Sequence, residues 1–189
     1  SLNKGQSAAN TRGINIMEEI IPDYIIITRD SLKDTYKKLA DWKTKTGIPT
    51  LIKTLEEIEV DYRGSDLPEK IRNYLLDVKK RWNGNSMLVL LGGDTDVVPA
   101  RLASGHEYSN YTADIYYVAN KVNWDPSTYS LSSSSDIAFQ SSSYIGRIPL
   151  KTITETNTFI NKLLTYEKAN DKNVDYSYFE NSLIVNAYL

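Results

Sequence analysis

The fold is decided by residues 87–96, which read MLVLLGGDTD. Residues 87–91 are the most apolar run in the chain, and such a short run is typical of a strand buried on both faces. The two glycines that follow predict a tight turn, because glycine adopts backbone conformations that other residues avoid. Asp94 and Asp96 should then project from the carboxyl end of the strand, where α/β proteins place functional loops.

On the amino-terminal side of this strand, apolar runs alternate with helical stripes. Residues 24–28 (YIIIT) and 49–54 (PTLIKT) are predicted strands. The helix between them is expected to start at a capping pair, Ser31 with Asp34, and to end at Gly47, which suits the left-handed position after a helix.

Residues 55–66 are interpreted as a connector, with Asp66 as the N-cap of a second helix. Apolar residues then recur with the 3.6-residue period of an amphipathic helix; they are Leu67, Ile71, Tyr74, Leu75, Val78 and Trp82. The order β-α-β-α-β predicts an α/β fold with a mainly parallel sheet, right-handed crossovers and helices on both faces.

The carboxyl-terminal half follows a different pattern. Residues 114–118 (DIYYV) are expected to form a strand, and 136–140 and 144–148 two short strands of a hairpin. Short antiparallel strands are therefore expected within residues 114–148. Thr152 forms a second capping box with the glutamate three residues later, which predicts the start of another helix.

Three further features concern the next helix and the chain ends. One face of the helix after Thr152 should carry Ile153, Ile160, Leu163, Leu164 and Glu167. Residues 182–187 (SLIVNA) begin a last apolar strand. Residues 1–13 are polar, contain two glycines and show no periodicity, and so we expect a flexible lead-in within residues 1–20, without a signal peptide.

Composition excludes several kinds of chemistry. The 189 residues contain no cysteine and one histidine, His106, which removes thiol nucleophiles, disulfides and thiolate metal sites. His106 is interpreted as a surface-loop residue, because no G-x-S-x-G elbow accompanies it. A net charge of −2 without a basic stripe argues against a nucleic-acid partner. No apolar run approaches the roughly 20 residues of a membrane span.

Acidic residues gather in and beside the loops of residues 92–136. Calcium takes six to eight oxygen ligands and needs neither histidine nor cysteine, so we predict a structural calcium ion and no required cofactor. Its candidate ligands are Asp94, Asp96, Glu107, Asp114 and Asp136, with Asp125 in the same region. The alternative is that Gly92 and Gly93 form a tight turn in which Asp94 bonds nearby backbone.

Two other features have competing interpretations. Arg147 could clamp a substrate anion, but an arginine at a strand end more often binds a carboxylate or backbone carbonyls. Gly146 beside it suggests a close backbone approach or a bulge. Residues 108–144, rich in tyrosine and serine, could bind carbohydrate or peptide, although a surface meander is the interpretation we favour.

Six motifs in order resemble the gingipain family of cysteine peptidases. They are YIIIT at 24–28, ADWKTKTG at 40–47, LLGGDTDVVP at 90–99, DIYY at 114–117, YIGRIP at 144–149 and YEK at 166–168. The resemblance covers about residues 22–189. It implies a caspase-like α/β fold of two side-by-side subdomains, with the catalytic histidine and cysteine in the second. Neither catalytic position can be carried over to a residue of this chain.

The resemblance implies that residues 21–180 form the first subdomain and that 181–189 begin the catalytic one. The chain would be the non-catalytic amino-terminal portion of a secreted or cell-surface bacterial cysteine endopeptidase. Its partner would be the carboxyl-terminal catalytic subdomain or a second processed chain, through which a protein or peptide substrate binds. One alternative is a stand-alone binding or assembly module at the cell surface. An independent metal-dependent hydrolase is the least favoured reading.

Overall fold

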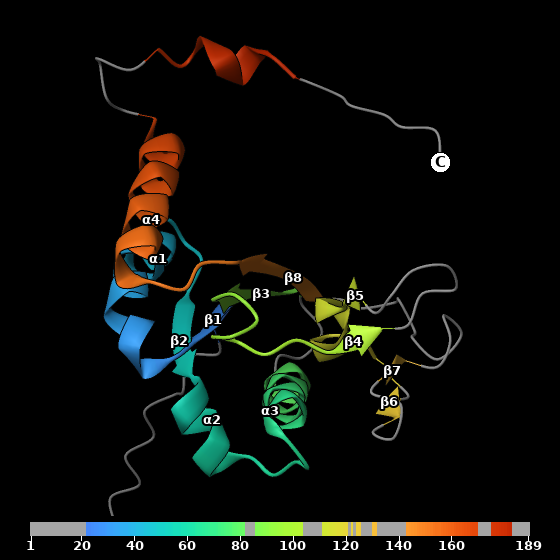
Figure 1. The fold of residues 1–189 in the computed structure, drawn as a ribbon. Helices are drawn as coiled ribbons and strands as arrows, with labels where there is room; N and C mark the ends of the chain where they lie inside the picture. The colour runs from blue at the N-terminus through green and yellow to red at the C-terminus, as the bar shows by residue number, and fades with distance from the viewer. Residues whose placement is uncertain are drawn as a thin grey trace, which may run out of the picture.

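Four parallel strands form the central sheet of the computed structural model, which describes residues 22–81, 86–103, 111–120, 122, 124–125, 130–131, 143–169 and 175–182 (Figure 1). The strands lie in the order β2-β1-β3-β8. Their bounds are β1 Tyr24–Thr28, β2 Thr50–Thr54, β3 Met87–Gly92 and β8 Ser143–Ile148. The register is regular: Ile26 pairs with Ile52 on one side and Leu90 on the other.

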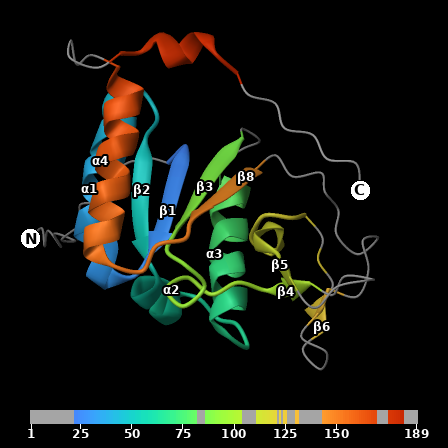
Figure 2. The same cartoon turned by 45° about the horizontal axis from the view of Figure 1, so that its top comes forward.

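Helices cover both faces of this sheet. Two of them, α1 (Asp30–Lys45) and α4 (Ile153–Lys168), pack together on one side. The other side carries α2 (Leu55–Asp61) and α3 (Leu67–Arg81), as Figures 1 and 2 show. The predicted α/β class, with a mainly parallel sheet and helices on both faces, is confirmed.

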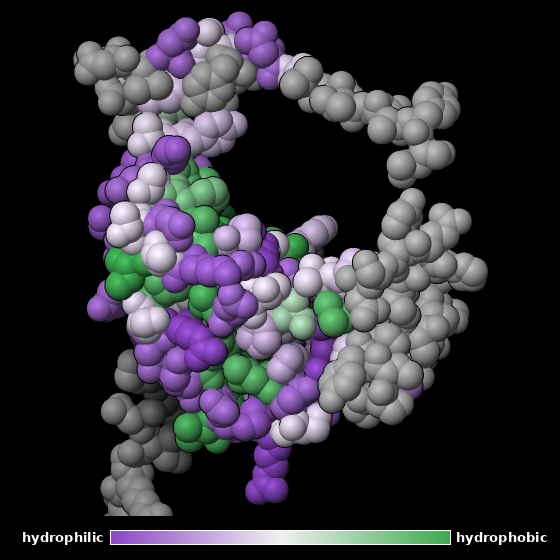
Figure 3. All heavy atoms as spheres, in the orientation of Figure 1, coloured by the Kyte–Doolittle hydropathy of each residue, from purple (hydrophilic) through white to green (hydrophobic). Residues whose placement is uncertain are grey.

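The core lies between these layers and uses the predicted apolar positions. Ile25, Ile26 and Ile27 of β1 are all 0% exposed, because β1 is an inner strand with helices on both sides. The helical stripes supply the rest of the packing; their buried members are Leu32, Tyr36, Leu39, Ile71, Tyr74, Leu75 and Val78. Polar side chains cover much of the surface in Figure 3, with hydrophobic patches between them.

The start of α1 was predicted wrongly. The helix begins at Asp30 after an N-cap residue, Arg29, whose side chain makes no capping hydrogen bond. Glu56 of α2 accepts the Asp30 N–H at 2.9 Å instead, so the cap comes from another element. The end was predicted correctly: Gly47 has a φ of +94°, the left-handed conformation expected after a helix.

The connector predicted at residues 55–66 is also wrong in part, because it contains α2. Thr54 and Glu57 form a reciprocal capping box, in which the Thr54 hydroxyl accepts the Glu57 N–H and Glu57 accepts the Thr54 N–H. The second box, Thr152 with Glu155 at the start of α4, was predicted and is confirmed. Ile153 was expected on the packed face of α4, but it is 53% exposed.

Replacing either capping threonine with alanine should lower the free energy of unfolding by about 1 kcal/mol, because an N–H of the first turn loses its acceptor. We expect Thr54→Ala and Thr152→Ala to behave alike in urea unfolding. Thr158→Ala is the matched control, since that exposed hydroxyl bonds a carbonyl within α4 and caps nothing. An equal loss in the control would contradict a capping role.

Residues 114–117 form a 3₁₀ helix, η1 (Asp114–Tyr117), and not the expected strand. Arg72 of α3 donates to the carbonyls of Tyr116 and Ala119, the second at 2.9 Å, which requires both carbonyls to face α3. Tyr116 and Tyr117 are both buried. A strand would turn these two neighbouring side chains to opposite faces.

The strand at the end of this region, β8, runs parallel to β3, and its predicted hairpin partner at 136–140 lies outside the described residues. Short antiparallel pairs do occur nearby: β4 (Leu102–Ala103) pairs with β5 (Tyr111–Thr112), and β6 (Trp124–Asp125) with β7 (Ser130–Leu131). A final 3₁₀ helix is η3 (Ser177–Glu180).

Several expectations concern positions outside the described residues: the lead-in at 1–20, the strand at 136–140, and all but the first residue of the strand at 182–187. In the part of the chain that the structure describes, no helix has the length and apolar character needed to cross a membrane.

Candidate functional site

The turn that leaves β3 depends on its two glycines. A Cβ on Gly92 would lie 2.7 Å from Cζ of the fully buried Tyr36, and a Cβ on Gly93 would lie 2.4 Å from Cγ1 of Val97. The backbone carbonyl of Asp94 accepts the N–H groups of Val97 and Val98, both at 2.8 Å. A tight turn at residues 94–98 therefore follows the two glycines, with Asp94 bonding local backbone. Neither glycine adopts a left-handed conformation, so each is required by close packing and not, as expected, by its backbone freedom.

The carboxylates of this turn face a lysine at the start of the α4 segment. Lys151 forms ion pairs with Asp94, at 3.4 Å, and with Asp96. The Asp94 side chain also accepts the N–H of Thr95 at 2.8 Å. That hydrogen bond, helped by Lys151, lowers the pKa of Asp94, while the two carboxylates raise the pKa of Lys151.

Arg147, at the carboxyl end of β8, binds the turn and η1 together. Its Nε and Nη2 donate to the two carboxylate oxygens of Asp114 at 2.8 and 2.7 Å. Nη1 donates to the carbonyls of Gly93 and Val98 at 2.8 and 2.6 Å, and Nη2 to that of Pro99 at 3.4 Å. These bonds occupy all five N–H donors of the guanidinium. Arg147 is therefore a structural partner, with no donor left for a substrate anion.

Gly146, next to Arg147, does not mark a close approach or a bulge. A Cβ there would meet no atom within 4 Å. The pairing of β8 with β3 is regular through this position, where Gly146 lies opposite Leu90. The expectation drawn from this glycine was wrong, because its open side lies on an uncovered part of the sheet.

The calcium ligands predicted from the sequence are only partly described. Asp94 and Asp96 bind Lys151, and Asp114 binds Arg147. The described residues contain no group of three or more acidic or histidine side chains arranged to hold a metal ion. Glu107 and Asp136, like His106, lie outside the described residues. The calcium site stays a prediction.

A second arginine fastens the β4 region to α3. Arg101, whose side chain is 7% exposed, donates to both carboxylate oxygens of Asp66 at 2.6 and 2.7 Å. Its guanidinium also lies 4.9 Å from the ring centre of Tyr116 and 4.4 Å from that of Trp124. Asp66 also accepts the N–H of Glu69 at 3.0 Å, so its predicted capping role is confirmed. No motif in the sequence indicated that Asp66 pairs with Arg101.

This pairing predicts an acid-dependent loss of stability. Burial would raise the pKa of Asp66, but the hydrogen bonds from Arg101 and from the Glu69 N–H outweigh it and lower the pKa. A lowered folded-state pKa stabilises the fold above the unfolded value of about 3.9, and this stabilisation is lost as the pH falls through the folded value. In urea unfolding below about pH 4, the free energy of unfolding of Asp66→Asn should fall less on acidification than that of the unmodified chain. Asp41→Asn, at an exposed carboxylate of α1, should keep the full loss; equal slopes for both variants would contradict this.

Two of the sequence motifs meet between α1 and α4. The indole N–H of Trp42 donates to Glu167 at 2.9 Å, and Lys43 binds the other Glu167 oxygen at 2.6 Å. Lys168 lies 5.2 Å from the centre of the Trp42 ring. ADWK and YEK therefore form one contact that holds the two helices together.

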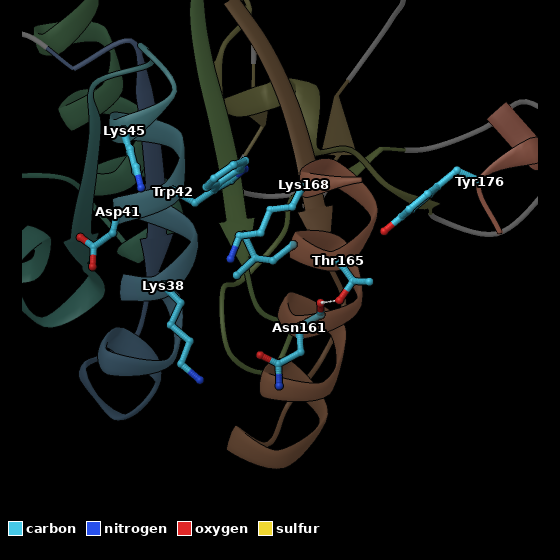
Figure 4. Close-up of a pocket in the computed structure, with 9 residues that line it drawn as sticks. Lys38, Asp41, Trp42, Lys45, Asn161, Thr165, Lys168 and Tyr176 are labelled. Atoms are coloured by element: carbon cyan, nitrogen blue, oxygen red, sulfur yellow. Dashed lines mark hydrogen bonds between the residues drawn. The ribbon is translucent and has the colours of Figure 1, made fainter. Parts of the chain in front are cut away.

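Beside this contact lies a groove of about 810 Å³, shown in Figure 4. Its walls come from α1 and α4, with one residue near η3. The lining residues are Lys38, Asp41, Trp42, Lys45, Asn161, Leu164, Thr165, Lys168 and Tyr176. Sequence reasoning missed this groove, because its residues are ordinary surface residues until the two helices pack together.

The described residues do not supply the chemistry of a cysteine peptidase. They include no histidine, and the whole chain has no cysteine, so no thiol and imidazole pair forms among them. Fold and site together define an α/β domain with a parallel sheet, in which the charged residues at the strand ends bind one another.

A comparison of the sequence with models of known protein families identifies the family of this chain. The model of Peptidase family C25 matches residues 18–187, and the chain belongs to this family. No match was found among curated proteins.

Three solved structures share the fold at low sequence identity. Dimeric latent PorU from Porphyromonas gingivalis has a TM-score of 0.60 at 20% identity, covering 77% of this chain and 16% of that one. The Arg-specific cysteine proteinase gingipain R has a TM-score of 0.55 at 23% identity, covering 76% and 28%. A structure described as a protease has a TM-score of 0.56 at 21% identity, covering 82% and 33%. The chain thus spans a third or less of each of these proteins.

Proposed function

We propose that this chain is the non-catalytic amino-terminal portion of a gingipain-like bacterial cysteine endopeptidase. Residues 21–180 form its first subdomain, and 181–189 begin the catalytic one, which carries the histidine and cysteine. Membership of Peptidase family C25 supports this proposal, as does the short share of each similar structure that the chain spans. The resemblance to gingipains favours a secreted or cell-surface location.

The role we propose is to support the catalytic subdomain through one side of the sheet. The observation that carries it is an edge left open: β8 ends the strand order, and no strand of the described residues pairs with its outer side. Next to this edge, a hollow of about 310 Å³ is lined by Tyr24, Lys43, Ile48, Leu88, Val89, Leu90, Tyr144, Ile145 and Gly146. Tyr144 is 64% exposed there. Burying an aromatic ring of this kind stabilises an interface by about 2 kcal/mol.

Substituting the exposed ring tests this role in the intact protein. Tyr144→Lys should lower peptidase activity several-fold and make the boundary near residue 181 more sensitive to limited proteolysis. The unfolding of this subdomain should stay unchanged, because the substituted ring lies on its surface. Tyr166→Lys is the matched control, since Tyr166 is 49% exposed on α4, away from β8. Identical activity and cleavage patterns for the two variants would contradict the docking role.

A further inference from the structure

The groove between α1 and α4 is built from two matched helix faces. Lys38, Asp41, Trp42 and Lys45 follow the spacing i, i+3, i+4, i+7 on α1, and Asn161, Leu164, Thr165 and Lys168 repeat that spacing on α4. Residues at this spacing lie on one side of a helix. Each wall is therefore about 10 Å long, at 1.5 Å per residue. That is the length of about three residues of an extended peptide.

The floor of the groove is apolar and firmly placed. Leu164 is 8% exposed, and Trp42 is half-buried with its indole N–H bound to Glu167. Because Lys43 binds the second oxygen of Glu167, that carboxylate is already neutralised. The groove thus offers an aromatic surface whose orientation is fixed before any ligand arrives.

The rim of the groove is positively charged in a chain whose net charge is −2. It carries three lysines, Lys38, Lys45 and Lys168, against one aspartate. Among the described residues, none of these lysines takes part in an ion pair, although Lys168 lies over the Trp42 ring. Figure 4 shows the Asp41 carboxylate pointing away from the space between the helices, while Lys168 reaches across toward Trp42.

We propose that this groove binds an acidic peptide segment, about three extended residues long, which bears carboxylates toward the lysines and an apolar side chain toward the floor. The side-chain amide of Asn161, exposed on the α4 wall, can pair with a backbone amide of such a segment. A peptide matches the length of the walls, the apolar floor and the charge of the rim together. The site belongs to α1 and α4 and does not depend on the proposed peptidase function.

The test uses the intact protein treated with iodoacetamide, so that no thiol protease activity degrades the probe. Residues 1–189 contain no cysteine, and near neutral pH the protonated lysines of the groove react far more slowly with iodoacetamide than a thiolate does. The probe is fluorescein-labelled Glu-Leu-Glu-Leu-Glu, and its matched control is Gln-Leu-Gln-Leu-Gln. Fluorescence polarisation should detect saturable binding of the first peptide only. Binding should weaken near 1 M salt, where the screening length falls to about 3 Å.

Variants then locate the site. We expect binding to weaken about tenfold in the triple variant Lys38→Gln, Lys45→Gln, Lys168→Gln. Each exposed ion pair contributes only a modest part of the binding free energy, so all three lysines are replaced together. Lys162→Gln is the matched control, on the same helix but outside this groove. In ¹⁵N spectra, the indole signal of Trp42, assigned with Trp42→Phe, should move on titration, while those of Trp82 and Trp124 stay in place.

Four results would overturn the proposal. One is equal binding of the acidic and amide peptides. The second is an equal loss of affinity for the acidic peptide in the triple variant and in Lys162→Gln. The third is an indole signal of Trp42 that does not move on titration. A galacturonate oligosaccharide is a second probe, since it presents carboxylates from a different source. Binding of that sugar without binding of the acidic peptide would also reject the peptide assignment.

Discussion

Replacing Arg147 with methionine is expected to lower the free energy of unfolding by about 3 kcal/mol, the low end of the cost of breaking a buried ion pair from one side, because Arg147 and Asp114 are both partly buried. Methionine keeps much of the volume but supplies no donor. Asp114, whose side chain is 24% exposed, is left without its cation, and the carbonyls of Gly93, Val98 and Pro99 lose their shared partner. Urea unfolding followed by circular dichroism measures this difference.

Two companion variants separate charge from geometry. Arg147→Lys keeps the charge but loses the planar fork that meets Asp114, so we expect an intermediate loss. Adding Asp114→Asn to Arg147→Met removes the unpaired carboxylate and should recover part of the stability. If Arg147→Met were as stable as the unmodified chain, the arginine would not be holding the turn and η1 together.

Substituting alanine for Gly92 is expected to cost about 1–3 kcal/mol, because the added methyl overfills a packed site. The new Cβ would lie 2.7 and 2.8 Å from Cζ and Cε2 of Tyr36, a ring that is 0% exposed. Since the ring is enclosed, it cannot swing away as a surface side chain would. Thermal and urea unfolding of Gly92→Ala should both report the loss.

Gly146→Ala is the matched control, on the neighbouring strand β8. A Cβ at Gly146 meets nothing within 4 Å, so its effect should stay within about 0.5 kcal/mol. Combining Gly92→Ala with Tyr36→Leu should restore part of the lost stability, because the smaller side chain opens space beside the new methyl. Equal losses for the two alanine variants would show that the Tyr36 contact is not the cause.

Patterns that depend on nearby residues were predicted well. The apolar run at 87–91 became β3, and the stripe that includes Ile71 and Leu75 became the buried face of α3. Gly47 ended α1 as expected, because helix termination is decided by a few adjacent residues. These features follow from the spacing of apolar residues along the chain and from the backbone conformations that individual residues prefer.

What the sequence did not predict depends on partners far along the chain. Residues 114–118 have the composition of a strand, but Arg72 bonds the carbonyl of Tyr116 within η1 and that of Ala119 just after it. At the start of α1, the N–H of Asp30 donates to the side chain of Glu56, which lies 26 residues further along the chain. The capping box at Thr54 was a local signal and could have been found, since threonine followed three residues later by glutamate is its signature.

The candidate site also contains some features that the sequence predicts and others that depend on distant partners. The turn after Gly92 and Gly93 followed from the sequence, whereas the groove needs α1 and α4 side by side before its lining residues border one space. The charged residues at the strand ends were singled out from the sequence. Their roles could not be assigned without the distances that pair Arg147 with Asp114.

The central claim is that this chain supports a thiol-dependent active site located outside these residues. The most direct measurement treats the intact protein with a thiol-directed peptidase inhibitor that carries a mass tag, and locates the tag by peptide mass spectrometry. We expect loss of peptidase activity and one tagged cysteine outside residues 1–189, which contain no cysteine. Peptidase activity that survives full alkylation, or an intact protein that takes up no tag, would contradict it.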